Sequence, residues 1–568
     1  MEDRKHVGYI IGGSLRDSFL ARLTVDPTVV QEGSFVVTDS GITRFYGLVT
    51  DIRLGSTDPR FADEQMEGKF PPEISKALLG HTLYTNLEIL PQLMLERGPE
   101  LGSRDYELWR AEHAGDSEPK LMPVKTVPMH HSQVSLADAG DIAAIFGDPK
   151  DDGNFIIGHT REQGHPICIN LDRFVQRSSG VFGATGTGKS FLTRLVLAGL
   201  MHHNKASVLV LDMHNEYGFD DIASDTKKQV IGLKTKFKSK VKIVGLGAGA
   251  RIRQKDRPDF DLEIAMKDIT TGDVELLTKS LNLRETTPTV LNALYQTFGN
   301  SWFEQFKNMN QEEVEDVDDR GKVTKVPAPG SVAAWCDSYG VNVMAAEALQ
   351  DKLRQLFNKK YIVEKPAQDG VKEIINNLQA GNHVVLSFGD HESDLDYLLV
   401  ANLITRLIRN TWESATNEFR AHGEKEPRPL VIVLEEAHKL LNREMANQTT
   451  FATIARELRK YYVTLLVVDQ RPSQIYDEVM SQLGTRVSGW LGDEDDIHAV
   501  LSGLAGREAI KGMLARLQPK EEVLLLGWGV PMPLPVRSRR YDTLFWDQLL
   551  GKDKPASSEA ELIKGLGF

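Results

Sequence analysis

The stretch RSSGVFGATGTGKSFLTRLVLAGLMHH, residues 177–203, decides the fold of this chain. Its apolar start is typical of a buried strand, its glycine-rich middle of a tight loop, and its end of a helix. Strand, glycine loop and helix in this order indicate an α/β domain with a parallel sheet. The loop at 183–190 also fits the pattern G-x-x-x-x-G-K-[ST] without deviation.

This loop pattern predicts a phosphate site. The glycines let successive backbone N–H groups turn toward phosphate oxygens, at the positive end of the helix that follows. Lys189 would reach the β- and γ-phosphates of ATP, and the Ser190 hydroxyl would hold Mg²⁺. A turn that binds nothing is the alternative, which the helix behind the loop disfavours. The expected cradle consists of Gly183, Ala184, Thr185, Gly186, Thr187, Gly188, Lys189 and Ser190.

A second apolar run, at 430–434, ends in two carboxylates. Ligands of an open parallel sheet bind at the carboxyl ends of its strands, so these side chains are expected beside the phosphate loop. We assign Glu435, with Ser190, to the magnesium ion and Glu436 to polarising the attacking water. Aspartate is usual at the first position, so Glu435 is a departure. Two glutamates at an exposed helix start are the alternative.

Two further strand-like runs also end in polar residues. LLVVDQRPS, at 465–473, places Gln470 where its amide could sense the γ-phosphate or the attacking water. SVLVLDMHNEYG, at 207–218, ends with Asp212 and Glu216, whose carboxylates would bind the hydration shell of magnesium or hold an arginine. Strand ends are often polar, so Gln470 alone is a moderate signal.

The segment FATIARELRKYY, at 451–462, offers arginines for catalysis. Arg456 and Arg459 are three residues apart, so they share one face of a helix. An arginine directed at the γ-phosphate of a neighbouring subunit could neutralise charge in the transition state. A solvated basic helix end is the alternative.

The chain as a whole is expected to be an α/β protein with a RecA-like P-loop NTPase core, an N-terminal β-barrel and a helical insertion. Runs such as HVGYIIGG, GSFVVTD and FYGLVTDI, broken by glycines, predict strands in the first part. NQEEVEDVDDRGKVTKVPAPG, inside the insertion, is expected to be a solvated, mobile loop. The expected limits are a barrel at 1–165, an ATPase core at 166–270 and 416–545, a helical insertion at 271–415 and a tail at 546–568.

Composition narrows the class of protein. Hydrophobic residues make up 41% and charged residues 26%, which is ordinary for a soluble globular chain. The two cysteines stand far apart, so we expect no disulfide framework and a cytoplasmic location. We expect no membrane association, since no run is long enough to span a bilayer. A formal net charge of −13 disfavours a protein that coats nucleic acid with its outer surface, but it allows DNA inside a channel.

These motifs in this order resemble the HerA branch of the HerA/FtsK ATPases: GATGTGKS, the strand ending DMHNEYG, the EEAH box, RELRKYY and DQRPSQ. The first 165 residues look like the barrel that heads HerA proteins. The resemblance implies a hexameric ring that threads double-stranded DNA, with ATP sites between subunits. By position it gives catalytic roles to Lys189, Ser190, Glu436 and Gln470, and makes Arg459 the trans-acting finger with Arg456 in reserve.

The resemblance also implies partners. Family members commonly work beside a nuclease of the NurA type in DNA-end processing, and bacterial relatives occur with other effectors in anti-phage defence. The barrel is the expected docking surface for such a partner. One rival hypothesis is an ATP-dependent ring scaffold that activates an effector without translocating DNA, and a second is an ATPase that remodels proteins.

Overall fold

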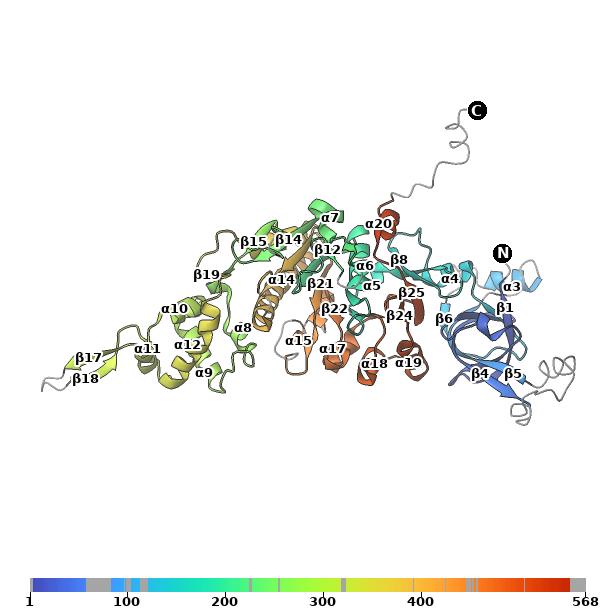
Figure 1. The fold of residues 1–568 in the computed structure, drawn as a ribbon, viewed down its shortest axis with the longest axis horizontal. Helices are drawn as coiled ribbons and strands as arrows, with labels where there is room; N and C mark the ends of the chain where they lie inside the picture. Colours follow the sequence, from blue (N-terminus) through green and yellow to red (C-terminus); the bar gives the residue numbers. More distant parts are fainter. Residues whose placement is uncertain are drawn as a thin grey trace, which may run out of the picture.

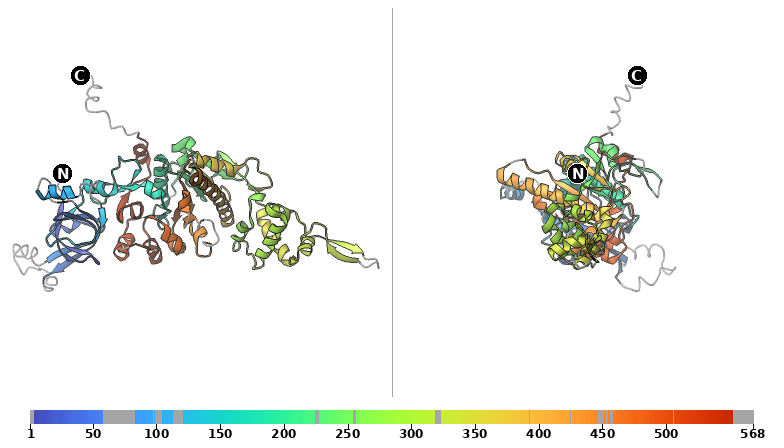
Figure 2. Two further views of the ribbon diagram at one scale, coloured as in Figure 1. Left: turned by 180° about the vertical axis from the view of Figure 1, so that it is seen from behind. Right: turned by 90° about the vertical axis from the view of Figure 1, so that its left-hand side faces the viewer.

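The computed structural model describes residues 4–551 except 58–82, 97, 99–103, 113–120, 224–226, 254–255, 318–322, 392, 424, 446–450, 452–453, 456–457 and 505. The molecule is elongated, with a barrel at one end, a core built on a large sheet in the middle and a helical region at the other end (Figure 1). A hairpin projects beyond the helical region, and α14 extends from the side of the core (Figure 2).

The N-terminal part closes into an antiparallel β-barrel. Six strands pair in the ring β1-β7-β3-β4-β5-β2, which the β2–β5 pairing closes, and β6 extends β5. Val7, Phe45, Leu87 and Val134 are among the apolar side chains that fill its interior. The predicted barrel is therefore confirmed. Its strands are β1 (His6–Gly13), β2 (Phe19–Leu23), β3 (Phe35–Ser40), β4 (Thr43–Ser56), β5 (Leu83–Glu96), β6 (Leu121–Pro123) and β7 (Gln133–Leu136).

The core is one 12-stranded sheet in the order β15-β14-β20-β11-β21-β22-β10-β23-β24-β25-β8-β9. The first eight strands in this order are parallel: β15 (Phe260–Leu262), β14 (Val241–Leu246), β20 (His383–Ser387), β11 (Ser207–Asp212), β21 (Leu430–Glu435), β22 (Val463–Asp469), β10 (Ser179–Phe182) and β23 (Thr485–Ser488). The last four are antiparallel: β24 (Glu522–Gly527), β25 (Leu534–Ser538), β8 (Asn154–His159) and β9 (Pro166–Asn170).

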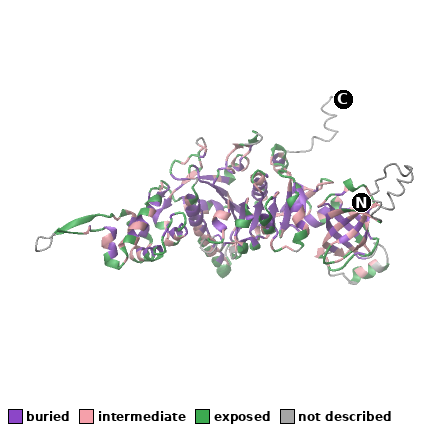
Figure 3. Cartoon of the chain, turned by 60° about the horizontal axis from the view of Figure 1, so that its bottom comes forward, coloured by how far each residue is buried: buried purple, intermediate pink, exposed green. Residues whose placement is uncertain are grey.

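Side chains of the parallel strands alternate between the two faces of this sheet. In β11, for example, Val208 and Val210 face one apolar cluster while Leu209 and Leu211 face the other. Both faces are buried, as Figure 3 shows for the middle of the molecule, which explains why the parallel strands read as continuous apolar runs. The cluster behind Val208 also includes Tyr46 of the barrel, so the barrel and the core share packed residues.

Helices and short 3-10 turns cover the sheet and link its strands. Those of the core and its approaches are η1 (Pro27–Val29), α3 (Arg104–Glu112), α4 (Ala139–Phe146), α5 (Leu171–Val175), α6 (Lys189–His202), α7 (Leu233–Phe237), η2 (Lys238–Lys240), α13 (Gly370–Gln379), α14 (Asp394–His422), α15 (His438–Leu441), η5 (Leu458–Tyr461), η6 (Pro472–Gln474), α17 (Asp477–Gln482), α18 (Glu494–Val500), α19 (Arg507–Ala515) and α20 (Thr543–Leu549). A small ribbon joins β12 (Asp221–Ile222) to β13 (Gln229–Val230). In the described ranges, no helix is both long and apolar enough to cross a membrane.

The helical region lies between β15 and α13 and packs around Trp302, Phe303 and Phe306, which are buried. Its elements are β16 (Ile264–Ala265), η3 (Met266–Asp268), α8 (Thr271–Glu275), α9 (Thr287–Phe298), η4 (Gly299–Ser301), α10 (Trp302–Asn308), β17 (Glu313–Val317), β18 (Val323–Pro327), α11 (Val332–Tyr339), α12 (Val343–Phe357) and β19 (Ile362–Val363). The acidic segment expected to be a mobile loop instead pairs β17 with β18 in an exposed hairpin (Figure 3).

The structure differs from the expected domain limits at three places. β8 and β9 belong to the central sheet, although 154–165 was expected in the barrel. β20 lies between β14 and β11, so 271–415 includes a core strand. Its run HVVLS is short and flanked by helical text, so periodicity does not single it out. The expected tail at 546–568 begins inside α20, whose Trp546 is fully buried, while 552–568 lie outside the described residues.

Candidate active site

The glycine loop connects the end of β10 to α6 at the carboxyl edge of the parallel strands. Its own contacts hold it in shape: Thr187 Oγ1 donates to the Ala184 carbonyl at 2.7 Å, and the Ala184 N–H donates to the Trp490 carbonyl at 3.0 Å. Gly186 and Gly188 have φ of 77° and 92°, a region that side chains rarely adopt. The glycines at these two positions are therefore required by the turn.

The helix behind the loop leaves its first amides available. Gly188 is the N-cap of α6 and supplies no side-chain cap. The N–H groups at the start of this helix thus have no side-chain acceptor at the cap, and the helix dipole adds partial positive charge there. This arrangement can bind a phosphate group.

Four side chains from three segments meet beside the loop. Thr185 Oγ1 donates to Gln470 Oε1 at 2.7 Å, and Gln470 Nε2 donates to Glu436 Oε2 at 3.3 Å. Lys189 Nζ lies 3.7 Å from Glu436 Oε1. The structure therefore brings together Lys189, at the start of α6, with Glu436 and Gln470, which follow the ends of β21 and β22.

The backbone at Glu436 is unusual. Its φ of 45° places a glutamate in the left-handed region, which costs of order 1–3 kcal/mol and persists only when surrounding contacts impose it. One such contact is Asp469, at the end of β22, whose Oδ2 accepts from the His438 N–H at 2.7 Å and lies 3.0 Å from His438 Nδ1. This pair ties the turn after β21 to the neighbouring strand.

The contact between His438 and Asp469 also shifts the pKa of each of these two side chains. The hydrogen bond to Asp469 raises the pKa of His438. Burial alone would raise the pKa of Asp469, but the hydrogen bond and the charge of His438 outweigh burial and lower it. Sequence reasoning passed over both residues, although a carboxylate at the end of β22 and the histidine of the EEAH box were visible signals.

Glu435 points into the protein beneath this layer. It is 5% exposed, and its Oε1 accepts from the Tyr217 hydroxyl at 2.5 Å. Its Oε2 is buried without a hydrogen-bond partner among the described residues. Burial, together with the charges of Asp212 and Glu216, raises the pKa of Glu435 to about 8.

Asp212 and Glu216 lie in the turn after β11. The two Asp212 oxygens accept from the N–H groups of Glu216 and Tyr217 at 2.8 and 3.0 Å, so this carboxylate shapes the turn. Burial raises the pKa of Asp212 to about 6. The arginine expected nearby is Arg194 of α6, which donates to the Glu216 carbonyl rather than to either carboxylate.

The donor set fits a magnesium ion that is held jointly with a nucleotide. Among the described residues no group of three or more His, Cys, Asp or Glu side chains could hold a metal alone. Magnesium usually takes one or two protein ligands besides phosphates and water. The unpartnered Oε2 of Glu435 is a buried acceptor that a cation or its water would satisfy.

Arg459 lies at the opposite edge of the sheet. It is exposed in η5, just before β22 begins, whereas Gln470 follows the end of β22. Seven residues of β22 separate the two edges, about 20 Å at 3.3 Å per residue. Arg456, the reserve arginine, lies outside the described residues.

Arg459 lines a cavity of about 720 Å³ at that opposite edge. Its described lining includes Arg173, Arg177 and Arg486 and contains no carboxylate. The Arg177 guanidinium sits 4.4 Å from the ring of Trp528. These residues were missed because they are scattered between strands, and no sequence spacing connects them.

Arg486 is the buried arginine of this lining. It is 4% exposed and donates to the carbonyls of Met480, Val500 and Ser502 rather than to a carboxylate. Burial lowers its pKa to about 10, which leaves it charged at neutral pH. An anion placed in the cavity would find no competing carboxylate in the described lining.

Comparison with known proteins gives two family matches. The model described as "Helicase HerA, central domain" matches residues 155–408, and the HAS barrel domain matches residues 7–78. A DNA double-strand break repair helicase HerA from Sulfurisphaera tokodaii is 22% identical over 552 residues, 94% of this chain and 93% of the relative. The protein of that name from Pyrococcus furiosus is 21% identical, with 79% of this chain and 80% of the relative covered.

Solved structures resemble the chain more distantly. VirB4 of Thermoanaerobacter pseudethanolicus matches 70% of this chain and 99% of its own, with 15% identity and a TM-score of 0.42. The bacterial conjugative coupling protein TrwB matches 71% of this chain and 92% of its own, with 11% identity and a TM-score of 0.44.

Proposed function

Because the chain belongs to the HerA family of ATP hydrolases, we propose that it is a ring-forming, ATP-driven translocase or helicase on double-stranded DNA. The curated relatives named above are DNA double-strand break repair helicases, and the match extends along nearly the full length of one of them. The layout of this chain supports the proposal: a phosphate loop, carboxylates on the next strand but one, and an amide on the strand between.

One observation supports the proposal that the subunits assemble into a ring. The phosphate loop and Glu436 lie at the carboxyl edge of the sheet, whereas Arg459 lies at the amino edge, about 20 Å away along β22. An arginine there cannot reach the nucleotide of its own subunit, but in a ring it faces the nucleotide of the next one. The cavity around Arg459, whose described lining holds no carboxylate, supports the same placement, since a triphosphate is strongly anionic. We propose a homo-hexamer with one ATP site at each interface.

The geometry beside the loop supports the proposed cis half of the site. Lys189 and the amides of 183–190 would hold the phosphates, and Ser190 and Glu435 would hold Mg²⁺, which when bound would neutralise charge on the phosphate oxygens. Glu436 accepts a proton from the attacking water, and Gln470, hydrogen-bonded to Glu436 and Thr185, orients that water and senses the γ-phosphate. Asp212 and Glu216 support this layer through the turn after β11.

The adjacent subunit contributes electrostatic stabilisation to the proposed site. Arg459 of the adjacent subunit neutralises charge that develops on the transferred phosphoryl group, the role of an arginine finger. Arg456 is the reserve candidate in the same segment. Loss of the γ-phosphate then frees the arginine, and this exchange drives movement of loops against DNA in the central channel.

The barrel is proposed as the docking surface for an effector. It stands at one end of the subunit, clear of the helical region (Figure 1). A nuclease of the NurA type or another defence effector would bind there, which places the protein in DNA-end processing or anti-phage defence.

DNA-stimulated hydrolysis tests the motor. The full chain is assayed for phosphate release with Mg²⁺ and ATP, alone and with a linear duplex longer than a ring can cover, and with single-stranded DNA of equal length as a control. A translocase hydrolyses ATP several-fold faster with duplex. Equal rates in all three mixtures would contradict translocation and favour a ring scaffold.

A further inference from the structure

The turn at 516–522, between α19 and β24, touches the phosphate loop from outside the catalytic layer. The Lys520 N–H donates to the Thr187 carbonyl at 3.1 Å. A Cβ built on Gly188 would lie 3.6 Å from the Cα of Lys520. The backbone of this turn therefore packs against the two residues that immediately precede Lys189.

Local chemistry makes this turn stiff. Pro519 fixes its own φ and restricts the residue before it. Lys520 has a φ of 67°, a left-handed conformation that a lysine adopts only under constraint. The Gln518 N–H donates to Glu522 Oε2 at 2.8 Å, and the Glu522 N–H donates to the Gln518 carbonyl at 3.0 Å. These bonds close the turn on itself, so a shift at one end moves the other.

The barrel holds the other side of the turn. Arg161 donates from Nη1 to the Glu32 carbonyl at 2.8 Å and from Nη2 to Glu522 Oε2 at 2.9 Å, joining the barrel loop to the turn. Arg516 makes a bidentate pair with the Glu32 carboxylate at 2.6 and 2.7 Å. Bidentate arginine pairs fix orientation as well as distance.

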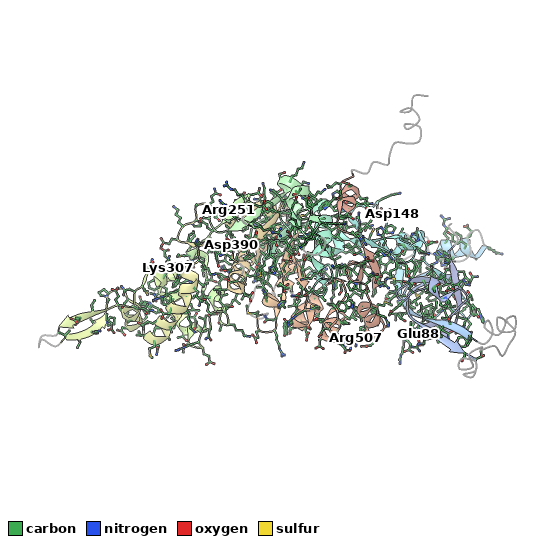
Figure 4. The ribbon with its side chains drawn as sticks, viewed as in Figure 1. Glu88, Asp148, Arg251, Lys307, Asp390 and Arg507 are labelled. Carbon is green, nitrogen blue, oxygen red and sulfur yellow. The ribbon has the colours of Figure 1, made fainter. Side chains whose placement is uncertain are left out.

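Packing keeps the barrel loop seated on the core. A Cβ added to Gly33 would lie 2.5 Å from Cγ of Pro535 in β25. Ser34 Oγ donates to Glu162 Oε1 at 2.5 Å. Figure 4 labels Glu88 of β5 in the barrel and Arg507 at the start of α19, in the part of the core next to the barrel. The loop at 32–34 thus meets the core through hydrogen bonds and close contact.

We propose that the turn at 516–522 is a positioning element for the phosphate loop and that the barrel sets its place through Arg161, Arg516 and Glu522. The inference rests on the proposed function and deepens it. Fixing the Thr187 carbonyl fixes the direction of the amides that follow it, which bind the phosphates. A partner that moves the barrel loop would change the affinity for nucleotide without touching the catalytic groups.

Nucleotide affinity of the full chain tests this inference. Arg516→Ala and Arg161→Ala are compared with wild type by titration with Mg²⁺ and ADP, and by the split between KM and kcat for ATP. Both variants should bind nucleotide roughly three- to thirtyfold more weakly. The kcat value should change much less, since Glu436 and Gln470 are untouched.

Arg53→Ala is the matched control. Arg53 is an exposed barrel arginine paired with Asp51 and Glu88, and its side chain is 64% exposed against 67% for Arg516. Among the described residues, Arg53 makes no hydrogen bond or ion pair with the turn, so its loss should leave nucleotide affinity at the wild-type value. Because Arg516 is on the surface, its removal leaves the fold intact, and circular dichroism checks that.

A double-mutant cycle measures whether Arg161 and Glu522 act together on nucleotide affinity. Arg161→Ala, Glu522→Gln and the double variant should show non-additive losses in nucleotide affinity, because the two side chains act through one contact. Arg161→Lys should recover part of the loss. Wild-type affinity in folded Arg516→Ala and Arg161→Ala, or strict additivity in the cycle, would overturn the inference. Failure of the wild-type chain to bind nucleotide would instead contradict the proposed function.

Discussion

The two edges of the central sheet carry opposite chemistry. At the carboxyl edge, Lys189 lies 3.7 Å from Glu436, with Glu435 buried beneath, at the start of a helix that has no side-chain cap. At the amino edge, the described lining of the cavity around Arg459 holds four arginines and no carboxylate. The carboxyl edge supplies the carboxylates and the amino edge supplies the cluster of arginines. The length of one strand separates the two edges.

Under the proposed function, this difference makes a subunit half of a catalytic unit. Phosphate binding and water activation need a preformed cradle and a carboxylate, which one chain supplies at one edge. Charge neutralisation needs cations that would repel Lys189 if they stood beside it without a nucleotide. In the proposed ring, the arginines at the far edge meet the nucleotide only when two subunits associate.

The largest expected effect comes from the cradle itself. Lys189→Ala removes the side chain that would pair with the β- and γ-phosphates, worth about 3 kcal/mol or more, a factor of at least roughly 100 in affinity. Turnover should fall to the level of a blank without enzyme, measured by phosphate release. Lys205→Ala, at the other end of α6 and paired with Asp152, is the control and should keep wild-type turnover.

The next prediction tests whether Arg459 acts on the nucleotide that a neighbouring subunit binds. Arg459→Ala should bind nucleotide but hydrolyse it roughly 10³-fold more slowly. Mixing this variant with Lys189→Ala should recover part of the activity, because an intact cradle then meets an intact arginine at some interfaces. Arg459→Lys should recover little, since an ammonium lacks the planar fork. No recovery at any mixing ratio would argue for Arg459 as a solvated side chain.

An effect confined to the chemical step separates nucleotide binding from hydrolysis at the carboxyl edge. Glu436→Gln should keep nucleotide affinity near the wild-type value and slow hydrolysis by roughly 10²–10⁴-fold, because the amide cannot accept the proton of the water. Nucleotide titration and single-turnover hydrolysis measure the two parts. Glu413→Gln on α14 is the control. Normal turnover of Glu436→Gln would assign water activation to another group.

The smallest effect concerns the tie between β21 and β22. The raised pKa of His438 means that its pairing with Asp469 stabilises the fold fully below pH 6.5, the ordinary value, and that this contribution is lost as the pH rises through the higher folded pKa. The difference in Tm between wild type and His438→Ala should therefore shrink from pH 6 to pH 8.5.

His498→Ala provides the comparison for that series. His498 lies on α18, and its side chain is 45% exposed beside Glu494, so solvent screens the pair. Its effect on Tm should be small across the same range. A His438→Ala difference that stays constant with pH would show that the imidazole acts there through packing alone.

Sequence reasoning reached the fold class because each core motif is local. The order of strand, glycine loop and helix at 177–203 predicts a P-loop core, and the structure has β10, the loop and α6 there. The polar ends of β21 and β22 are also visible in the sequence, which predicts Glu436 and Gln470 as site residues, and a hydrogen bond joins the two in the structure. Their catalytic roles stay predictions.

The remaining features depend on contacts between distant segments. The buried position of Glu435 follows from Tyr217, which lies more than 200 residues earlier in the chain. β20 has too short an apolar run to be told from a helix by periodicity. The arginines at the amino edge come from segments that share no spacing, so only the folded sheet gathers them.

By itself, the sequence determined the strand–loop–helix units, the phosphate loop and the polar ends of the strands, because these depend on neighbours along the chain. The tertiary structure alone decided that arginines gather at the edge opposite the phosphate loop and that a barrel loop holds the turn behind Thr187. Glu32 and Arg516, for instance, are 484 residues apart and meet at 2.6 Å. Such pairings arise from strand order and packing, which no local pattern encodes.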